Sequence, residues 1–99
     1  MRIVISSGEV KVEDAENLRE LAVVAPGLMP QDVGAALAAS RLGTVEDRHV
    51  WLDAGRLHDV ALAMVTADGW EHGWTAMVGY AMSRGWTDSH GRIRAHIEM

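Results

Sequence analysis

The fold is decided by the last stretch of the chain, Arg92-Ile93-Arg94-Ala95-His96-Ile97-Glu98-Met99. Apolar and polar side chains alternate along it, and successive side chains of a β-strand point to opposite faces of the sheet. One face therefore carries Ile93, Ala95, Ile97 and Met99, and the other carries Arg92, Arg94, His96 and Glu98. The pattern predicts a half-buried strand over 92–98 whose polar face gathers more ionisable groups than any other segment.

Shorter signals predict further strands and four helices. Two β-branched runs, 2–5 and 9–12, are separated by Ser6-Ser7-Gly8 and predict a hairpin, and residues 49–52 predict another strand. Helices are expected to begin near Asp14, Pro30, Asp53 and Asp68, because aspartate caps helix N-termini and proline suits a first turn. The expected architecture is an α+β fold with four helices packed on a three- or four-stranded sheet.

The two halves of the chain share a pattern. Residues 14–22 place a cap, a small residue and apolar positions in the same order as residues 53–61. This similarity suggests strand–helix–helix repeats over 9–44 and 48–87, closed by the strand 92–98. The alternative is that any capped amphipathic helix shows this pattern. In either case residues 1–99 are expected to form one small domain.

Composition restricts the class of protein. The 99 residues are 48% hydrophobic and 23% charged, which is typical of a soluble globular domain. The formal net charge of −5 argues against nucleic-acid binding, and no apolar run is long enough to span a membrane. There is no cysteine, which excludes disulfide and thiolate chemistry. We expect a cytoplasmic protein, and the preference for arginine over lysine indicates a bacterial, GC-rich genome.

A candidate site joins the polar faces of two strands. Alternation in the strand at 49–52 places His49 and Trp51 on the side away from its apolar residues. If this strand pairs with 92–98, one surface holds His49, Trp51, Arg94, His96 and Glu98. His96 or His49 would move a proton and Glu98 would orient it. Arg94 would hold an anionic group and Trp51 would stack on a planar part. The simpler interpretation is a solvated strand face with cross-strand ion pairs.

Tryptophans form a second candidate site. The chain has four tryptophans, one tyrosine and no phenylalanine. Trp70 and Trp74 share one helical face and Trp86 follows that helix, so the three could wall an apolar ligand pocket. Their spacing is explained equally by core packing. The five histidines form no compact ligand motif, so no metal and no cofactor are expected.

Two functions remain compatible with these patterns. The first is a soluble, non-catalytic binding or accessory module that binds a small molecule or a partner protein. It would form a homodimer through the second expected helix, which begins near Pro30 and is largely apolar, or through the surface around Trp51. The alternative is a cofactor-independent acid–base enzyme, such as an isomerase, lyase or cyclase, acting on a small, partly apolar substrate that can carry an anionic group. The sequence leaves open whether the protein is an enzyme. The enzyme requires these side chains around one concave pocket together with a histidine of shifted pKa, whereas the binding module predicts them spread over a convex surface.

Overall fold

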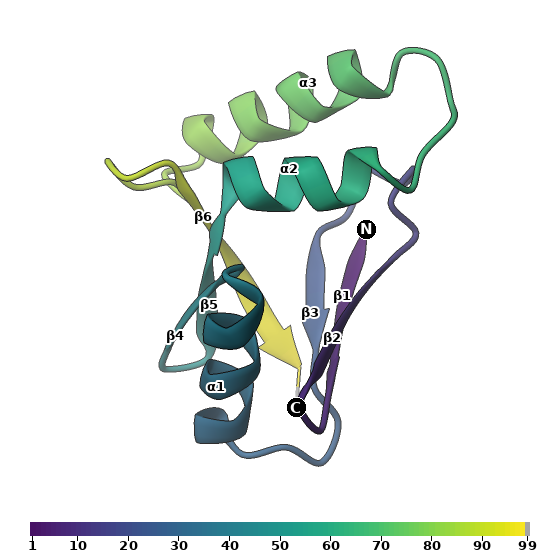
Figure 1. The fold of residues 1–99 in the computed structure, drawn as a ribbon. Helices are drawn as coiled ribbons and strands as arrows, with labels where there is room; N and C mark the ends of the chain where they lie inside the picture. Colours follow the sequence, from purple (N-terminus) through teal and green to yellow (C-terminus); the bar gives the residue numbers. More distant parts are fainter. Residues whose placement is uncertain (99) are drawn as a thin grey trace.

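The computed structural model describes residues 1–98 as three helices and one six-stranded mixed sheet. The strands are β1 (Arg2–Ser6), β2 (Glu9–Glu13), β3 (Ala22–Val24), β4 (Gly43–Glu46), β5 (His49–Asp53) and β6 (Arg92–Glu98). The helices are α1 (Pro30–Ser40), α2 (Ala54–Leu62) and α3 (Trp70–Ser83). The strand order is β2-β1-β3-β6-β5-β4. The sheet curls so that α1 contacts both edge strands, β4 and β2, while α2 and α3 lie across one end (Figure 1).

The N-terminal hairpin and the C-terminal strand are confirmed. β1 and β2 pair antiparallel, with the apolar pairs Ile3↔Val12 and Ile5↔Val10 on one face. β6 spans Arg92–Glu98, and its inward residues are buried while its outward residues are exposed or half-buried. Met99, which we expect on the inward face, lies outside the described residues. Strict alternation therefore predicts this strand and its two faces correctly.

The prediction of four helices on three or four strands is wrong. Asp14 does not cap a helix; it has φ of 54° and lies in a turn. The segment that follows ends in β3, whose valines pair in parallel with β1 on one side and β6 on the other. β-Branched valines suit the centre of a sheet. The pairing of β3 with two strands therefore decides the structure here, although the apolar spacing of residues 14–22 predicts a helix. These residues therefore do not mirror α2, and the strand–helix–helix correspondence is absent here.

β4 is the other element that the sequence does not predict. Arg41 ends α1 in the left-handed conformation with φ of 60°, and the chain then enters β4 at Gly43. A Cβ atom on Gly43 would lie 2.0 Å from the carbonyl oxygen of Trp51 in β5. Glycine at this position therefore allows the close approach of the two strands, rather than ending a helix.

One buried cluster connects the inner face of the sheet with all three helices. The alternation of the strands and the apolar stripes of the expected helices predict nine core residues. Five of them are confirmed as buried: Val50, Leu52, Leu57, Ile93 and Ile97. The other four are half-buried: Leu18, Leu21, Val60 and Met77. Among residues 1–98, no helix is both long and apolar enough to cross a membrane.

Candidate functional site

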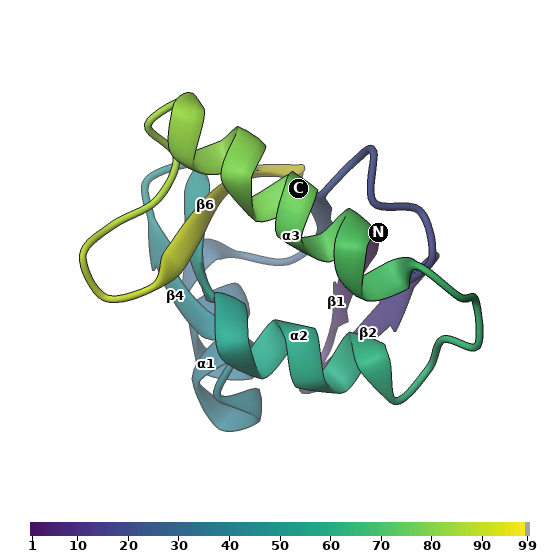
Figure 2. The same cartoon turned by 90° about the horizontal axis from the view of Figure 1, so that it is seen from above.

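An open groove lies where β3 and β6 diverge beneath α3. Within residues 1–98 these two strands pair only through Val23↔Ile97 and Val24↔Glu98, so they separate towards the start of β6. α3 passes over this opening, as seen from the side and from above (Figures 1 and 2). The groove has a volume of about 1050 Å³. Small-molecule sites commonly occupy about 300–1,000 Å³, so the groove is large enough for such a ligand.

Three segments form the walls of the groove. The first is the inward side of α3, the second is the loop 16–21, and the third is the β6 wall, which comprises β6 and the neighbouring end of β5. Two aromatic side chains, Tyr80 and Trp86, meet edge to face near the C-terminal end of α3, with ring centroids 5.8 Å apart. The loop contributes Leu18 and Leu21, which accounts for their half-buried state. The groove therefore has a largely apolar interior.

The β6 wall carries the two predicted histidines side by side. β5 and β6 pair antiparallel, with His49 opposite His96 and Trp51 opposite Arg94. The ring centroids of His49 and His96 lie 5.6 Å apart at an interplanar angle of 74°. Both histidines and Arg94 line the groove; His49 is half-buried and the other two are exposed. The pairing of the two strands thus brings three of the candidate residues to one concave surface.

Of the other candidate residues, some line the groove and some lie outside it. Trp51 and Glu98 occupy the same sheet face as the histidines but do not line the groove. Trp51 is half-buried, and the guanidinium carbon of Arg92 lies 5.7 Å from its ring centroid. Trp70 and Trp86 line the groove, whereas Trp74 is buried in the core. Only part of the polar face borders the groove, because the groove lies where β3 and β6 are no longer paired.

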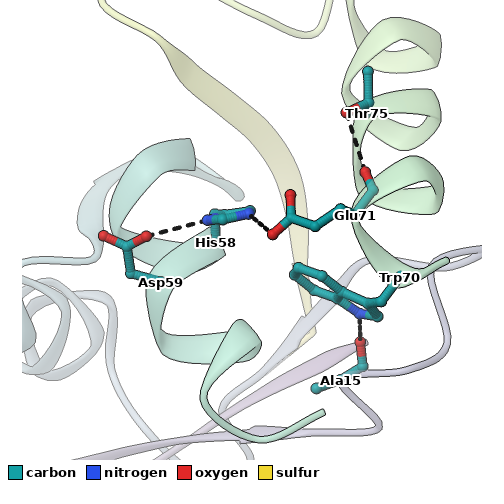
Figure 3. A network of polar contacts seen from close by, with 6 residues as sticks. All are labelled: Ala15, His58, Asp59, Trp70, Glu71 and Thr75. Atoms are coloured by element: carbon teal, nitrogen blue, oxygen red, sulfur yellow. Dashed lines mark hydrogen bonds and ion pairs between the residues drawn. The ribbon is translucent and has the colours of Figure 1, made fainter. Parts of the chain in front are cut away.

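The sequence does not predict a polar cluster that joins α2 to α3 (Figure 3). From the sequence alone, His58 is predicted on a solvated polar face of its helix, and Asp68 with Glu71 is predicted to form a capping box. The structure contradicts both predictions, since His58 is half-buried. α3 begins after Gly69 without a side-chain cap, and Glu71 instead faces His58. His58 Nδ1 lies 3.1 Å from Asp59 Oδ1, and Nε2 lies 2.7 Å from Glu71 Oε1. No local spacing relates residues on two different helices, so the pattern carries no signal for this cluster.

The two carboxylates beside His58 favour its charged form. Its hydrogen bonds with Asp59 and Glu71 raise the pKa of His58 above the ordinary value, outweighing the opposing effect of partial burial. Its side chain is 22% exposed, and the imidazole packs against two indoles, with centroids 5.5 Å from Trp70 and 5.4 Å from Trp74. The cluster therefore connects two helices through both charge and aromatic packing.

A second polar cluster fixes the turn into β6. Asp88 Oδ1 accepts the backbone N–H groups of His90 and Arg92, both at 2.9 Å. Its Oδ2 lies 2.6 Å from Arg92 Nε. Burial opposes ionisation of Asp88, but the donors from Arg92 and His90 outweigh it and hold the pKa of this carboxyl below its usual value. This turn sets the position of Trp86 relative to β6, because Arg94 N–H donates to the Trp86 carbonyl at 2.8 Å.

The structure is that of a small α+β protein with a solvent-open groove large enough for a small molecule. No protein-family model, curated protein or solved structure matches the chain. Within residues 1–98, no three histidine, aspartate or glutamate side chains are grouped to hold a metal ion.

Proposed function

We propose that the protein is a binding module whose groove takes a partly apolar small molecule with an anionic group. The observation that carries this proposal is the position of Arg94, His49 and His96 on one wall of an otherwise largely apolar groove. A guanidinium can hold a carboxylate or phosphate through paired hydrogen bonds, and imidazole N–H groups can add further donors. The β6 wall is therefore the side that would receive the anionic group.

The distribution of charge and aromatic rings supports one orientation of the ligand. The opposite wall, the loop 16–21, carries Glu16 and Glu20 with a single arginine, Arg19, so it offers an anion fewer donor side chains than the β6 wall. Tyr80 is 60% exposed although it lines the groove, and a bound apolar group would remove its ring from water. The apolar part of the ligand would accordingly lie against Tyr80 and Trp86.

The fluorescent anion 1-anilinonaphthalene-8-sulfonate (ANS) tests this proposal, because it combines an aromatic body with a sulfonate. Arg94→Gln should weaken ANS binding about tenfold, since a hydrogen bond to a charged group contributes about 1.5 kcal/mol. Binding is measured by fluorescence titration. Arg2→Gln is the matched control, because it removes the same charge from an exposed residue of β1 outside the groove.

A neutral relative of the probe separates the anion site from the apolar site. N-phenyl-1-naphthylamine lacks the sulfonate, so Arg94→Gln should leave its affinity unchanged. If Arg94→Gln and Arg2→Gln weakened ANS binding equally, the effect would come from net charge alone and the anion site would be refuted.

The histidine pair supports a second function, an acid–base enzyme acting on the same class of ligand. His49 and His96 face one groove, and histidine can take up and release protons near neutral pH. In this proposal His96 or His49 moves the proton and Arg94 holds the substrate. Glu98 would orient a histidine only after moving towards the groove. His96→Ala would then abolish turnover while the thermal midpoint stays nearly unchanged. Loss of folding instead would assign His96 to stability.

Self-association through α1 or the Trp51 surface stays a prediction. α1 presents several exposed alanines, including Ala35, Ala38 and Ala39, and such a surface can be covered by a second copy. Sedimentation velocity should show a dimer at micromolar concentration. A monomer at high micromolar concentration would refute this prediction.

A further inference from the structure

We propose that His58 and Glu71 form a pH-dependent latch that holds α3 over the groove, so that ligand binding weakens as the pH rises. The latch is a property of the contact between α2 and α3, whereas its effect on ligand binding rests on the function proposed above. The site regulated is the groove itself, because α3 provides one of its walls.

The latch acts on the end of α3 that begins the groove wall. Glu71 lies in the first turn of α3, beside Trp70, which lines the groove. The Trp70 indole N–H donates to the Ala15 carbonyl at 2.7 Å, and its ring stacks on Trp74 at 5.6 Å between centroids. His58 packs against both indoles. Its Nε2 lies 2.7 Å from Glu71 Oε1 (Figure 3). The contact between His58 and Glu71 therefore belongs to the same packed group of side chains that positions this wall of the groove.

The charge states explain the dependence on pH. His58 faces Asp59 from its own helix and Glu71 from α3, and its other ring neighbours, Trp70 and Trp74, do not titrate. Only the doubly protonated imidazolium can donate a hydrogen bond from both ring nitrogens to the two carboxylates. Loss of one proton removes the positive charge of the ring and leaves one nitrogen lone pair facing a carboxylate oxygen. Without that charge the hydrogen bond between His58 and Glu71 is no longer an ion pair, which weakens the contact between the helices.

The direction of the effect follows from the pKa of His58. Because the hydrogen bonds that His58 donates to Asp59 and then to Glu71 raise this pKa in the folded state, the cluster stabilises the fold fully below the ordinary value of 6.5. This contribution is lost as the pH rises through the higher pKa of the folded state. The latch is thus closed below pH 6.5 and opens as the pH rises through the raised pKa of His58.

Amide hydrogen exchange measures the latch without any ligand. Between pH 6 and pH 8.5, the opening equilibrium of the first turns of α3 should rise about two- to fivefold, the range expected of an exposed ion pair, after correction for intrinsic exchange. Glu71→Gln removes the carboxylate on α3 and should abolish this dependence. His58→Gln should do the same. His72→Gln is the control, because His72 is an exposed histidine on α3 outside the cluster.

The same pH series with N-phenyl-1-naphthylamine tests the regulation of binding. This neutral probe carries no charge for the ionisable side chains of the groove to attract, so its affinity reports on the groove wall that α3 provides. Its affinity should fall about two- to fivefold with rising pH in the unchanged protein and in His72→Gln, but not in Glu71→Gln.

Each outcome separates the two proposals. If Glu71→Gln kept the full pH dependence of exchange and of probe affinity, the latch would be overturned while the groove remained a binding site. If the probe bound at no pH, the proposed function and its regulation would both be overturned, and the exchange measurement would still decide the latch on α3.

Discussion

Gly43→Ala is expected to destabilise the protein more than any other single methyl addition among the described glycines. The new Cβ would lie 2.0 Å from the Trp51 carbonyl oxygen and 3.2 Å from the Leu52 Cα atom. Both are backbone atoms of a paired strand, so neither can move without separating β4 from β5. Overpacking commonly costs about 1–3 kcal/mol, and a clash with paired backbone should cost at least about 3 kcal/mol.

Urea denaturation measures this loss, with Gly34→Ala as the matched control. Gly34 lies within α1, and the nearest atom to an added Cβ is Val45 Cγ2 at 4.0 Å, which is an ordinary contact. Alanine is a better helix former than glycine, so Gly34→Ala should stabilise the protein by about 0.5–1 kcal/mol. A loss below about 1 kcal/mol for Gly43→Ala would contradict the register between β4 and β5.

Leu57→Ala is expected to lower the free energy of unfolding by about 2–5 kcal/mol. Leu57 is fully buried on the inward side of α2 and belongs to the cluster that joins the helices to the sheet. The substitution removes apolar contacts and leaves a cavity that the surrounding strands can close only in part. Thermal and urea denaturation should both show the loss.

Leu62→Ala provides the comparison within the same helix. Leu62 is 42% exposed at the end of α2, so its truncation should cost less than about 1 kcal/mol. If Leu57→Ala cost less than about 0.5 kcal/mol, the buried face assigned to α2 would be wrong.

The sequence predicts those elements in which the spacing of apolar side chains, or a capping residue, marks the element directly. Alternation in β6 sets one buried and one polar face, and α1 and α2 begin where Pro30 and Asp53 indicate. Residues 14–22 mislead because Leu18 and Leu21 carry a helical spacing but line a groove from a loop. β3 has only three residues, and its position between β1 and β6 depends on pairing over long separations.

Only one part of the candidate site can be predicted from the sequence, namely the side chains that alternation places on one face of β5 and β6. The shared face of His49, Arg94 and His96 follows from the period of two in each strand, once the strands pair. The limits of the groove depend on where β3 leaves β6 and on how α3 crosses that opening. The contact of His58 with Glu71 joins two helices whose packing no local pattern encodes.

The most direct test of the proposed binding function is an NMR titration of the ¹⁵N-labelled protein with ANS, followed through backbone amide shifts. The proposal predicts saturable shift changes in the residues around the groove, in β6 near Arg94 and His96 and in α3 near Met77 and Tyr80. Amides of the distant strand β2 should stay unchanged. Absence of saturable shifts at the groove, or larger shifts in β2 than in β6, would contradict the account.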